Sequence, residues 1–279
     1  MKAKATMKSQ PQSDAVDAVH QHPKKKISFS ELKIWNECAF KHKLNYIDGI
    51  KSFTGNQYTA FGTALHYVCE VRVQEDITDN RAAEIFKENF IKELKSLDPD
   101  SIDKKMSLQM VDQGKNLVKF ILPELKKSFE EFEVVSVEEQ LFEGITEFET
   151  DFNFKGFIDL VIKTPDDKYH VIDWKTCSWG WNAQKKSDPM TVYQLSFYKN
   201  YFAKKHGIDP KNIETYFALL KRTAKKDNVE IFRVTNGPKR VANAVDLLRR
   251  ALTHINSENY IKNKLSCSKC EFYKTPHCP

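Results

Sequence analysis

Hydrophobic residues recur at helical spacing through the first half of the chain. The segment 27–50 has an apolar face made of Leu32, Ile34, Trp35, Cys38 and Phe40, preceded by Ser28 and Ser30 as candidate helix caps. From about Ala60 a buried stripe follows the i, i+3, i+4, i+7, i+8 spacing, through Phe61, Ala64, Leu65, Val68 and Cys69. More polar helical patterns cover 81–95 and about 105–131. The pattern predicts a helical segment with Cys38 on an early helix and His66 at the border of the second stripe.

After residue 132 the period changes from helical to alternating. Three strand-like segments follow one another, 134–142, 154–163 and 169–176, and the turn sequence TPDDK separates the last two. We expect them to form an antiparallel meander. The remaining expected elements are a helix over about 191–205, strands near 215–221 and 230–235, and a helix over about 238–255. The alternation predicts an α/β fold.

Charged residues interrupt two of these strands. Asp159 lies in GFIDLVI, and Asp173 and Lys175 flank Trp174 in HVIDWKT. An unpaired buried carboxylate is costly, so each Asp needs a compensating group. One interpretation is structural, because Lys175 lies on the same face of the strand as Asp173 and is able to pair with it. The other is a functional site, because one lysine cannot satisfy two carboxylates.

Two carboxylates, main-chain oxygens and water form a hard-oxygen site that suits Mg²⁺ or Mn²⁺. A lysine beside such a site orients or deprotonates an attacking water and offsets charge in a phosphoryl transition state. Because side chains alternate along a strand, Asp173 and Lys175 point to one side and Trp174 points to the other.

Half of the six cysteines fall in the last thirteen residues. Cys267 and Cys270 are spaced for two-point metal binding, and Cys278 follows after a short loop. Two kinds of metal site are compatible with this cysteine spacing. A Zn²⁺ ion would take the three cysteines and His277 in a local knuckle, whereas a [4Fe-4S] cluster would recruit a distant fourth thiolate. Cys69 is expected in the core, and Cys177 remains without an assignment.

Composition and charge narrow the class of protein. The hydrophobic content of 41% is ordinary for a globular protein, no run is long enough to span a membrane, and no secretory signal is present. We therefore expect a cytoplasmic protein with reduced cysteines. The net charge of +6 and clustered lysines suit a polyanionic partner, although solvated lysines alone give the same pattern. Residues 1–26 indicate a disordered basic tail, with organelle targeting as the alternative.

Four motifs in order resemble the RecB-like exonuclease branch of the PD-(D/E)xK nuclease superfamily. Gly156 to Asp159 matches its G-x-x-D strand, and Asp173-Trp174-Lys175 matches its D-x-K strand. Gln194 and Tyr198 match its Q-x-x-x-Y helix, and Gly62 and His66 match its upstream G-x-x-x-H motif. Each motif alone is weak, but the four span residues 62–198 in the expected strand and helix contexts.

The resemblance implies a role for each matched residue. Asp159, Asp173 and the main-chain carbonyl of Trp174 would bind Mg²⁺ or Mn²⁺, His66 would be a further ligand, and Lys175 would act on the hydrolytic water. Taken alone, a histidine at this position is more often a hydrogen-bonded core residue.

The helix that carries the Q-x-x-x-Y motif would place Gln194 and Tyr198 one turn apart, facing the lysine, the water or a phosphate. Packing for Tyr198 and capping of a strand carbonyl for Gln194 are equally good interpretations. Family members often carry an acidic residue at the position of Glu139 on the first strand, and the adjacent Glu138 leaves that match ambiguous by one position.

The resemblance also favours the iron-sulfur interpretation of the cysteines. The CRISPR-associated RecB-like exonucleases and the AddB nuclease domain place one cysteine before the G-x-x-x-H motif and three at the C-terminal end. This implies a [4Fe-4S] cluster on Cys38, Cys267, Cys270 and Cys278 that clamps the start of the fold to its end, with structural Zn²⁺ as the alternative.

The implied architecture is an α/β restriction-endonuclease-like core, a mixed central sheet flanked by helices, with an N-terminal helical segment and a C-terminal cysteine-cluster staple. The expected divisions are a basic tail (1–26), a helical segment carrying Cys38 and His66 (27–131), the nuclease core (132–236), and a C-terminal helix with the cysteine cluster (237–279).

The loop after the third strand combines aromatic and basic residues. It contains Trp179, Trp181, Lys185 and Lys186. Aromatic rings stack on unpaired bases and lysines contact phosphates, so the loop is a candidate nucleic-acid contact. The alternative is a loop held in place by two half-buried tryptophans. No base-reading motif is present, so sequence-specific binding is not expected.

These observations together predict a metal-dependent DNA exonuclease that hydrolyses single strands or duplex ends. The expected setting is recombination, repair, replication or CRISPR adaptation, with a helicase, a recombinase or adaptation proteins as partners. A structure-specific or nicking endonuclease, and a non-catalytic nucleic-acid-binding module on the same fold, are the alternatives.

Overall fold

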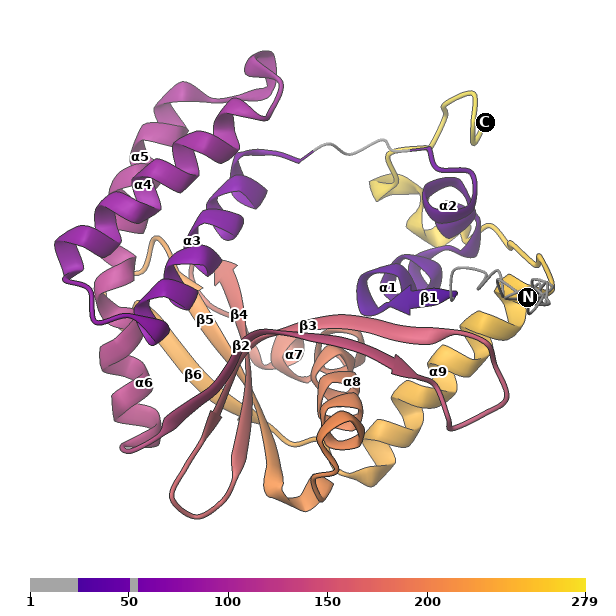
Figure 1. Cartoon of the computed structure of the whole chain (residues 1–279). Helices are drawn as coiled ribbons and strands as arrows, with labels where there is room; N and C mark the ends of the chain where they lie inside the picture. Colours follow the sequence, from indigo (N-terminus) through magenta and orange to yellow (C-terminus); the bar gives the residue numbers. More distant parts are fainter. Residues whose placement is uncertain (1–24, 51–54) are drawn as a thin grey trace, which may run out of the picture.

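The computed structural model describes residues 25–50 and 55–279 (Figure 1). All but the last two residues of the predicted basic tail therefore lie outside the described residues. Within this range no helix is both long and apolar enough to cross a membrane.

Helices make up most of the first half of the described chain. They are α1 (Phe29–Glu37), α2 (Ala39–His42), the π-helix η1 (Lys43–Ile47), α3 (Gln57–Gln74), α4 (Asp79–Lys95), the 3-10 turn η2 (Pro99–Ser101), α5 (Lys104–Leu117), the 3-10 turn η3 (Val118–Phe120) and α6 (Ile121–Phe129). The predicted helical segment is confirmed. The helix expected over about 105–131 is instead divided at η3, just before Pro123, which lacks a donor and is tolerated only in a first turn.

The rest of the chain alternates strands with helices. The elements are β2 (Glu133–Gly144), β3 (Asn153–Lys163), β4 (Tyr169–Cys177), α7 (Ala183–Ser187), α8 (Pro189–His206), the 3-10 turn η4 (Pro210–Asn212), β5 (Ile213–Lys221), β6 (Val229–Val234), α9 (Pro238–Asn256) and the 3-10 helix η5 (Lys264–Lys269). Strands β2, β3 and β4 pair antiparallel in sequence order, which confirms the predicted meander.

These strands belong to one mixed sheet. Its order within the described residues is β1-β3-β4-β5-β6, and β2 also pairs with β3. Strand β1 (Lys26–Ser28) runs parallel to the start of β3, and β4 runs parallel to β5. The sequence pattern did not predict β1, because three residues are too few to establish an alternation.

Helices cover both faces of the sheet. Helices α3 to α6 lie together on one side, and α8 and α9 lie on the other (Figure 1). The first core contains Phe61, Leu65, Phe86, Leu160 and Trp174, and the second contains Phe154, Ile158, Phe197, Tyr201 and Leu248. The predicted α/β fold class, a mixed sheet flanked by helices, is confirmed. Cys69 is fully buried in the first core, as expected.

Cys38 differs from its prediction. It is not inside a helix but between α1 and α2, in an extended conformation with φ of −163° and ψ of 115°. The backbone leaves the helix here because it contacts the C-terminal segment. The N–H of Phe40 donates to the Ile261 carbonyl at 3.3 Å, and the N–H of Asn263 lies 3.3 Å from Cys38 Sγ. The two ends of the described chain therefore meet at Cys38.

Candidate active site

Strands β3 and β4 separate at Asp159 and leave a gap in the sheet. One edge of β3 pairs with β1 over Asn153–Lys155 and with β4 only from Leu160 onward, so residues 156–159 have no ladder partner on that edge. Asp159 Oδ2 crosses this gap and accepts a hydrogen bond from the Trp174 main-chain N–H at 2.7 Å. The carboxylate thus replaces the ladder partner that Trp174 has lost, and the two motif strands separate where polar groups are needed.

Helix α3 brings His66 to the same gap. Its Nδ1 lies 3.6 Å from Asp159 Oδ1. Burial lowers the pKa of His66, but the Asp159 and Asp173 carboxylates outweigh burial and the pKa is raised. The motif glycine on this helix faces β4, since a Cβ on Gly62 would lie 3.4 Å from Thr176 Oγ1. A small residue here lets α3 approach the strand that carries Asp173.

Asp173 is the most enclosed acid of the site. Its side chain is 2% exposed, and its Oδ2 lies 2.6 Å from Lys175 Nζ. Burial raises the pKa of Asp173 to about 6 although Lys175 opposes the shift. Burial lowers the pKa of Lys175, but Asp173 and Asp159 outweigh it and keep the lysine protonated. The ion pair of the structural interpretation is therefore present, and Asp159 is satisfied separately.

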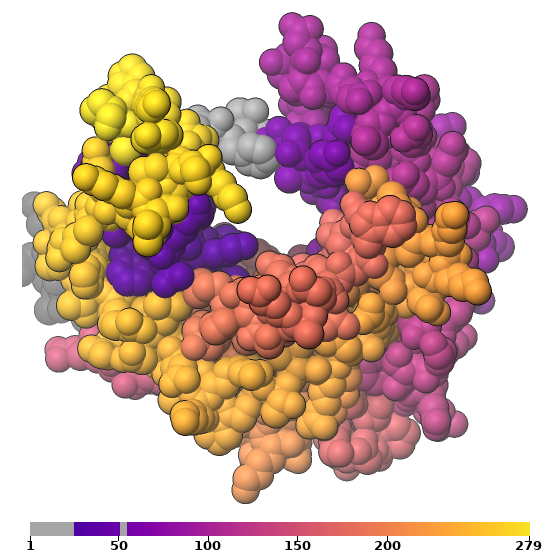
Figure 2. All heavy atoms as spheres, turned by 180° about the vertical axis from the view of Figure 1, so that it is seen from behind, coloured from indigo at the N-terminus to yellow at the C-terminus, as the bar shows by residue number. Residues whose placement is uncertain are grey.

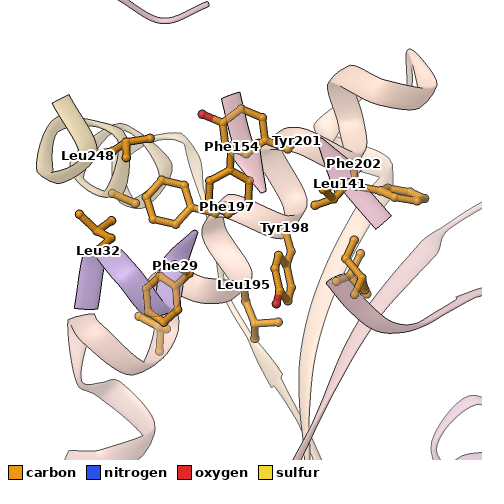
Figure 3. Packing of buried hydrophobic residues seen from close by; sticks show 14 of the residues in the cluster. Phe29, Leu32, Leu141, Phe154, Leu195, Phe197, Tyr198, Tyr201, Phe202 and Leu248 are labelled. Carbon is orange, nitrogen blue, oxygen red and sulfur yellow. The ribbon is translucent and has the colours of Figure 1, made fainter. Parts of the chain in front are cut away.

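Helix α8 presents Gln194 and Tyr198 to the gap from the opposite side. Gln194 Nε2 donates to Tyr198 Oη at 2.9 Å. Figure 3 shows the Tyr198 ring at the edge of the aromatic cluster of Phe154 and Phe197, with its hydroxyl pointing away from them. A Cβ on Gly156 would lie 3.0 Å from Tyr198 Cε1, so the motif glycine makes room for this ring.

The sequence left the acidic residue of the first strand ambiguous, and the ion pairs separate the two candidates. Glu139 lies 2.6 Å from Lys205 Nζ and 2.9 Å from His206 Nε2, away from the site. Glu138 adopts a φ of 49° and is exposed by surface area, but partial desolvation and the charge of Asp159 raise its pKa. Glu138 is therefore the glutamate whose charge interacts with Asp159.

Two residues that no motif indicated interact electrostatically with charged groups of the site. Glu70 lies one turn after His66 on α3, and its pKa is raised to about 7 by burial and by Glu138. The sequence could have indicated Glu70 through its i, i+4 spacing from His66, which places both residues on one face of the helix. Lys33 on α1 has its pKa lowered by burial and by the charges of Lys185 and Lys175. Nothing in the sequence connected this helix with the strand that carries Asp173 and Lys175.

The donor set suits a hard divalent cation. Asp159, Asp173 and the Trp174 carbonyl offer oxygen ligands, His66 offers nitrogen, and the buried Asp173 Oδ2 accepts no hydrogen bond of good geometry within the described chain. These donors do not form a complete metal-binding group, however. Among residues 25–50 and 55–279, no three His, Cys, Asp or Glu side chains are grouped so that they bind a metal ion.

The predicted aromatic and basic contacts divide into two groups. Trp181 packs on Phe217, with ring centres 5.1 Å apart, and Lys186 forms an ion pair with Glu230. Trp179 is 72% exposed. Lys185 lies over the Trp181 ring and has no acidic partner within the described residues. Trp179 and Lys185 are therefore the two members of the loop that are available to a ligand.

The four cysteines assigned to a cluster line one cavity. Cys38, Cys267, Cys270 and Cys278 border a space of about 290 Å³, and His277 is not among the residues that line it. The side chain of Asn263 donates to the Glu37 carbonyl at 2.9 Å and so fixes the C-terminal segment beside Cys38. The cavity therefore brings Cys38 to the three C-terminal cysteines, although within the described residues no three of these side chains are grouped so that they bind a metal ion.

Comparisons with known proteins bear on the fold and the family. A family model described as the PD-(D/E)XK nuclease superfamily matches residues 26–275. A solved structure of a candidate exonuclease from Eubacterium rectale has a TM-score of 0.59 at 13% identity, over 97% of this chain and 96% of that one. This likeness shows the fold. The structure of SSO0001 has a TM-score of 0.36 at 16% identity over 77% of this chain and 94% of its own, which is too low to bear on the fold. No curated protein matches the sequence.

Proposed function

We propose, from the premise that the chain belongs to the PD-(D/E)XK nuclease superfamily, that this nuclease is a metal-dependent DNA exonuclease of the RecB-like branch. Its substrates are single strands or duplex ends. The observation that carries the proposal is the separation of β3 from β4 at Asp159, which gathers Asp159, Asp173 and Lys175 at one opening of the sheet.

The proposed roles follow from the chemistry of these side chains. When bound by Asp159, Asp173, the Trp174 carbonyl and His66, Mg²⁺ or Mn²⁺ supplies Lewis-acid activation of the phosphodiester and of water. Lys175 is held protonated by Asp173, so it is suited to orient the water and offset negative charge on the transition state. Gln194 and Tyr198, linked by their hydrogen bond, position the water or a phosphate oxygen.

The cysteine cavity supports a second part of the proposal. Cys38, Cys267, Cys270 and Cys278 hold a [4Fe-4S] cluster that joins the N-terminal helical segment to the C-terminal segment. Zn²⁺ bound at the same segment is the alternative. In this proposal the cluster clamps the helical segment (27–131) to the C-terminal segment (237–279), so that the chain, with its nuclease core (132–236), closes around a nucleic-acid channel.

The proposed setting is the cytoplasm, in recombination, repair, replication or CRISPR adaptation, with a helicase, a recombinase or adaptation proteins as partners. The space-filling view supports access for a long polymer. Figure 2 shows an opening between α1 with the C-terminal segment on one side and α3 to α5 on the other. Trp179 and Lys185 are proposed to contact the strand near this opening.

The test is a cleavage assay with Mg²⁺ or Mn²⁺ on end-labelled single-stranded, duplex and covalently closed circular DNA. We expect degradation of the first two and no cleavage of the circle. Cleavage of the circle would instead support the endonuclease alternative, and absence of cleavage on every substrate would support the non-catalytic binding module.

A further inference from the structure

Most residues that line the cavity beside Asp159 belong to none of the sequence motifs. The cavity measures about 560 Å³ and lies between β1, the start of α1, η1 and the stretch of β3 that lacks a ladder partner. Asp159, Gln194 and Tyr198 form part of its lining. The rest of the lining consists of three aromatic residues, two lysines, two serines, a glycine and one glutamate, so the cavity adjoins the candidate active site with a different chemistry.

Two aromatic side chains are exposed in this cavity. Phe157, two residues before Asp159, is 41% exposed, and Tyr46 on η1 is 43% exposed. A neighbour supports each ring. Tyr46 stacks on His42 with ring centres 5.3 Å apart, and Lys155 Nζ lies 5.5 Å from the centre of the Phe157 ring. Supported aromatic rings with exposed area are the usual platforms for unpaired bases.

The cavity lining carries two lysines and two carboxylates, Glu31 and Asp159, and Asp159 already accepts a main-chain hydrogen bond. Lys26 and Lys155 line the cavity, and neither has an acidic partner within ion-pair distance in the described part of the chain. Glu31 also lines the cavity, but its Oε1 lies 2.9 Å from His42 Nε2. Two lysines are therefore available to an anion, while the nearby glutamate already has a partner.

We propose that this cavity binds one unpaired nucleotide of the DNA strand, with its base against Phe157 and Tyr46 and its phosphates near Lys26 and Lys155. The inference rests on the proposed nuclease function and defines its substrate as a strand that is unpaired beside the cleaved phosphate. A base inside a duplex has both faces covered by its neighbours, so only an unstacked base offers a face to these rings. The volume also suits one small ligand rather than a duplex.

The experiment compares Phe157→Ala and Tyr46→Ala with the wild type on single-stranded oligonucleotides that carry one abasic nucleotide at successive positions. The wild type should lose affinity and show a raised KM when the abasic nucleotide falls in the cavity, by about 5-fold to 100-fold if one stacked base is lost. The two variants should bind the intact strand more weakly by a similar factor, and they should be insensitive to the abasic position.

Matched controls isolate the cavity from general effects. Phe120→Ala removes an aromatic residue of similar exposure, 39%, that does not line the cavity, and it should behave as the wild type. Lys155→Ala should reduce the slope of log affinity against log salt by about 0.7, whereas Lys168→Ala, in the β3–β4 turn, should leave the slope unchanged. Thermal melts confirm that each variant is folded.

Binding is measured in an Asp173→Asn background, so it is read independently of cleavage. If the wild type cleaves DNA but Phe157→Ala matches it at every abasic position, the subsite is overturned and the nuclease function stands. If the wild type cleaves none of the substrates, the proposed function is overturned, whatever the binding shows.

Discussion

Asp159 and Trp174 are joined across an opening of the sheet by a hydrogen bond of 2.7 Å from the Trp174 main-chain N–H to Asp159 Oδ2. Trp174 is 2% exposed, so this N–H needs an acceptor inside the protein. The carboxylate that is proposed to bind a metal therefore also completes the hydrogen bonding of β4. The negative charge of Asp159 serves the proposed metal binding, and its acceptor oxygen serves the hydrogen bond to Trp174. Different substitutions remove one or both of these properties.

Asp159→Asn keeps an acceptor oxygen and removes the charge, whereas Asp159→Ala removes both. We expect both variants to lose DNA cleavage by at least about 100-fold, because each removes a proposed ligand and its electrostatic stabilisation. Only Asp159→Ala should also lose about 1–3 kcal/mol of unfolding free energy, because the Trp174 N–H becomes an unsatisfied buried donor. Urea denaturation and single-turnover cleavage measure the two effects.

Asp151→Asn is the matched control, since Asp151 is an exposed acid that pairs with Lys25 outside the site. It should change neither cleavage nor stability appreciably. Equal stability losses in Asp159→Asn and Asp159→Ala would show that the hydrogen bond to Trp174 does not contribute as argued.

Metal binding should stabilise the folded protein, independently of any activity. Asp159 and the buried Asp173 repel each other, and a divalent cation relieves this repulsion. At a Mg²⁺ or Mn²⁺ concentration about 100 times the Kd, the unfolding free energy should rise by about 2.7 kcal/mol. Differential scanning fluorimetry should therefore show a higher Tm with metal in the wild type and little change in Asp173→Asn. A Tm that is indifferent to both metals in the wild type would contradict this donor set.

The cysteine proposal predicts different results for two residues near the C-terminal segment. A protein with a [4Fe-4S] cluster is expected to be brown. Cys38→Ser should abolish this colour and lower iron from about four per chain, because it removes one ligand of a Cys₄ site. His277→Ala should leave iron unchanged, since this residue does not line the cavity. Iron analysis after anaerobic purification measures both, with Cys177→Ser as the control on a different half-buried cysteine. Colourless protein with one zinc that depends on His277 would favour the local knuckle.

The parts of the site that follow strong local patterns could be predicted from the sequence, and those that depend on the path of the chain could not. The alternating strands gave the meander, and the D-x-K strand indicated Asp173 and Lys175. The break at Cys38 was missed because its cause is a contact with residues 261–263, far away in the sequence.

The interactions of Glu138 and Lys33 with the site could not be predicted from local sequence patterns for the same reason. Glu138 is distinguished from Glu139 by its positive φ and by the ion pairs that its neighbour forms with α8, and a strand pattern contains neither. The charge of Lys175 contributes to the lowered pKa of Lys33, although the two residues are far apart in the sequence. Electrostatic interactions between residues that are distant in the sequence therefore needed the structure.

Glu70 provides a pH-dependent test of the acidic group on α3. Burial and Glu138 raise its pKa from the ordinary 4.5 to about 7, so the folded protein holds this proton more tightly than the unfolded chain does. Its contribution to stability is therefore fully present below about pH 4.5 and is lost as the pH rises through 7. We expect the unfolding free energy of the wild type in EDTA to fall between pH 5 and pH 8.

Glu70→Gln should make this decline shallower, because glutamine is neutral throughout and no charge is forced into the site at high pH. Urea denaturation of both proteins at several pH values measures the difference, which should be small at pH 5 and should favour the variant at pH 8. Glu88→Gln on α4 replaces an exposed glutamate that pairs with Arg81, and it should follow the wild type. A variant that is less stable than the wild type by the same amount at both pH values would show that Glu70 contributes through packing and not through its titration.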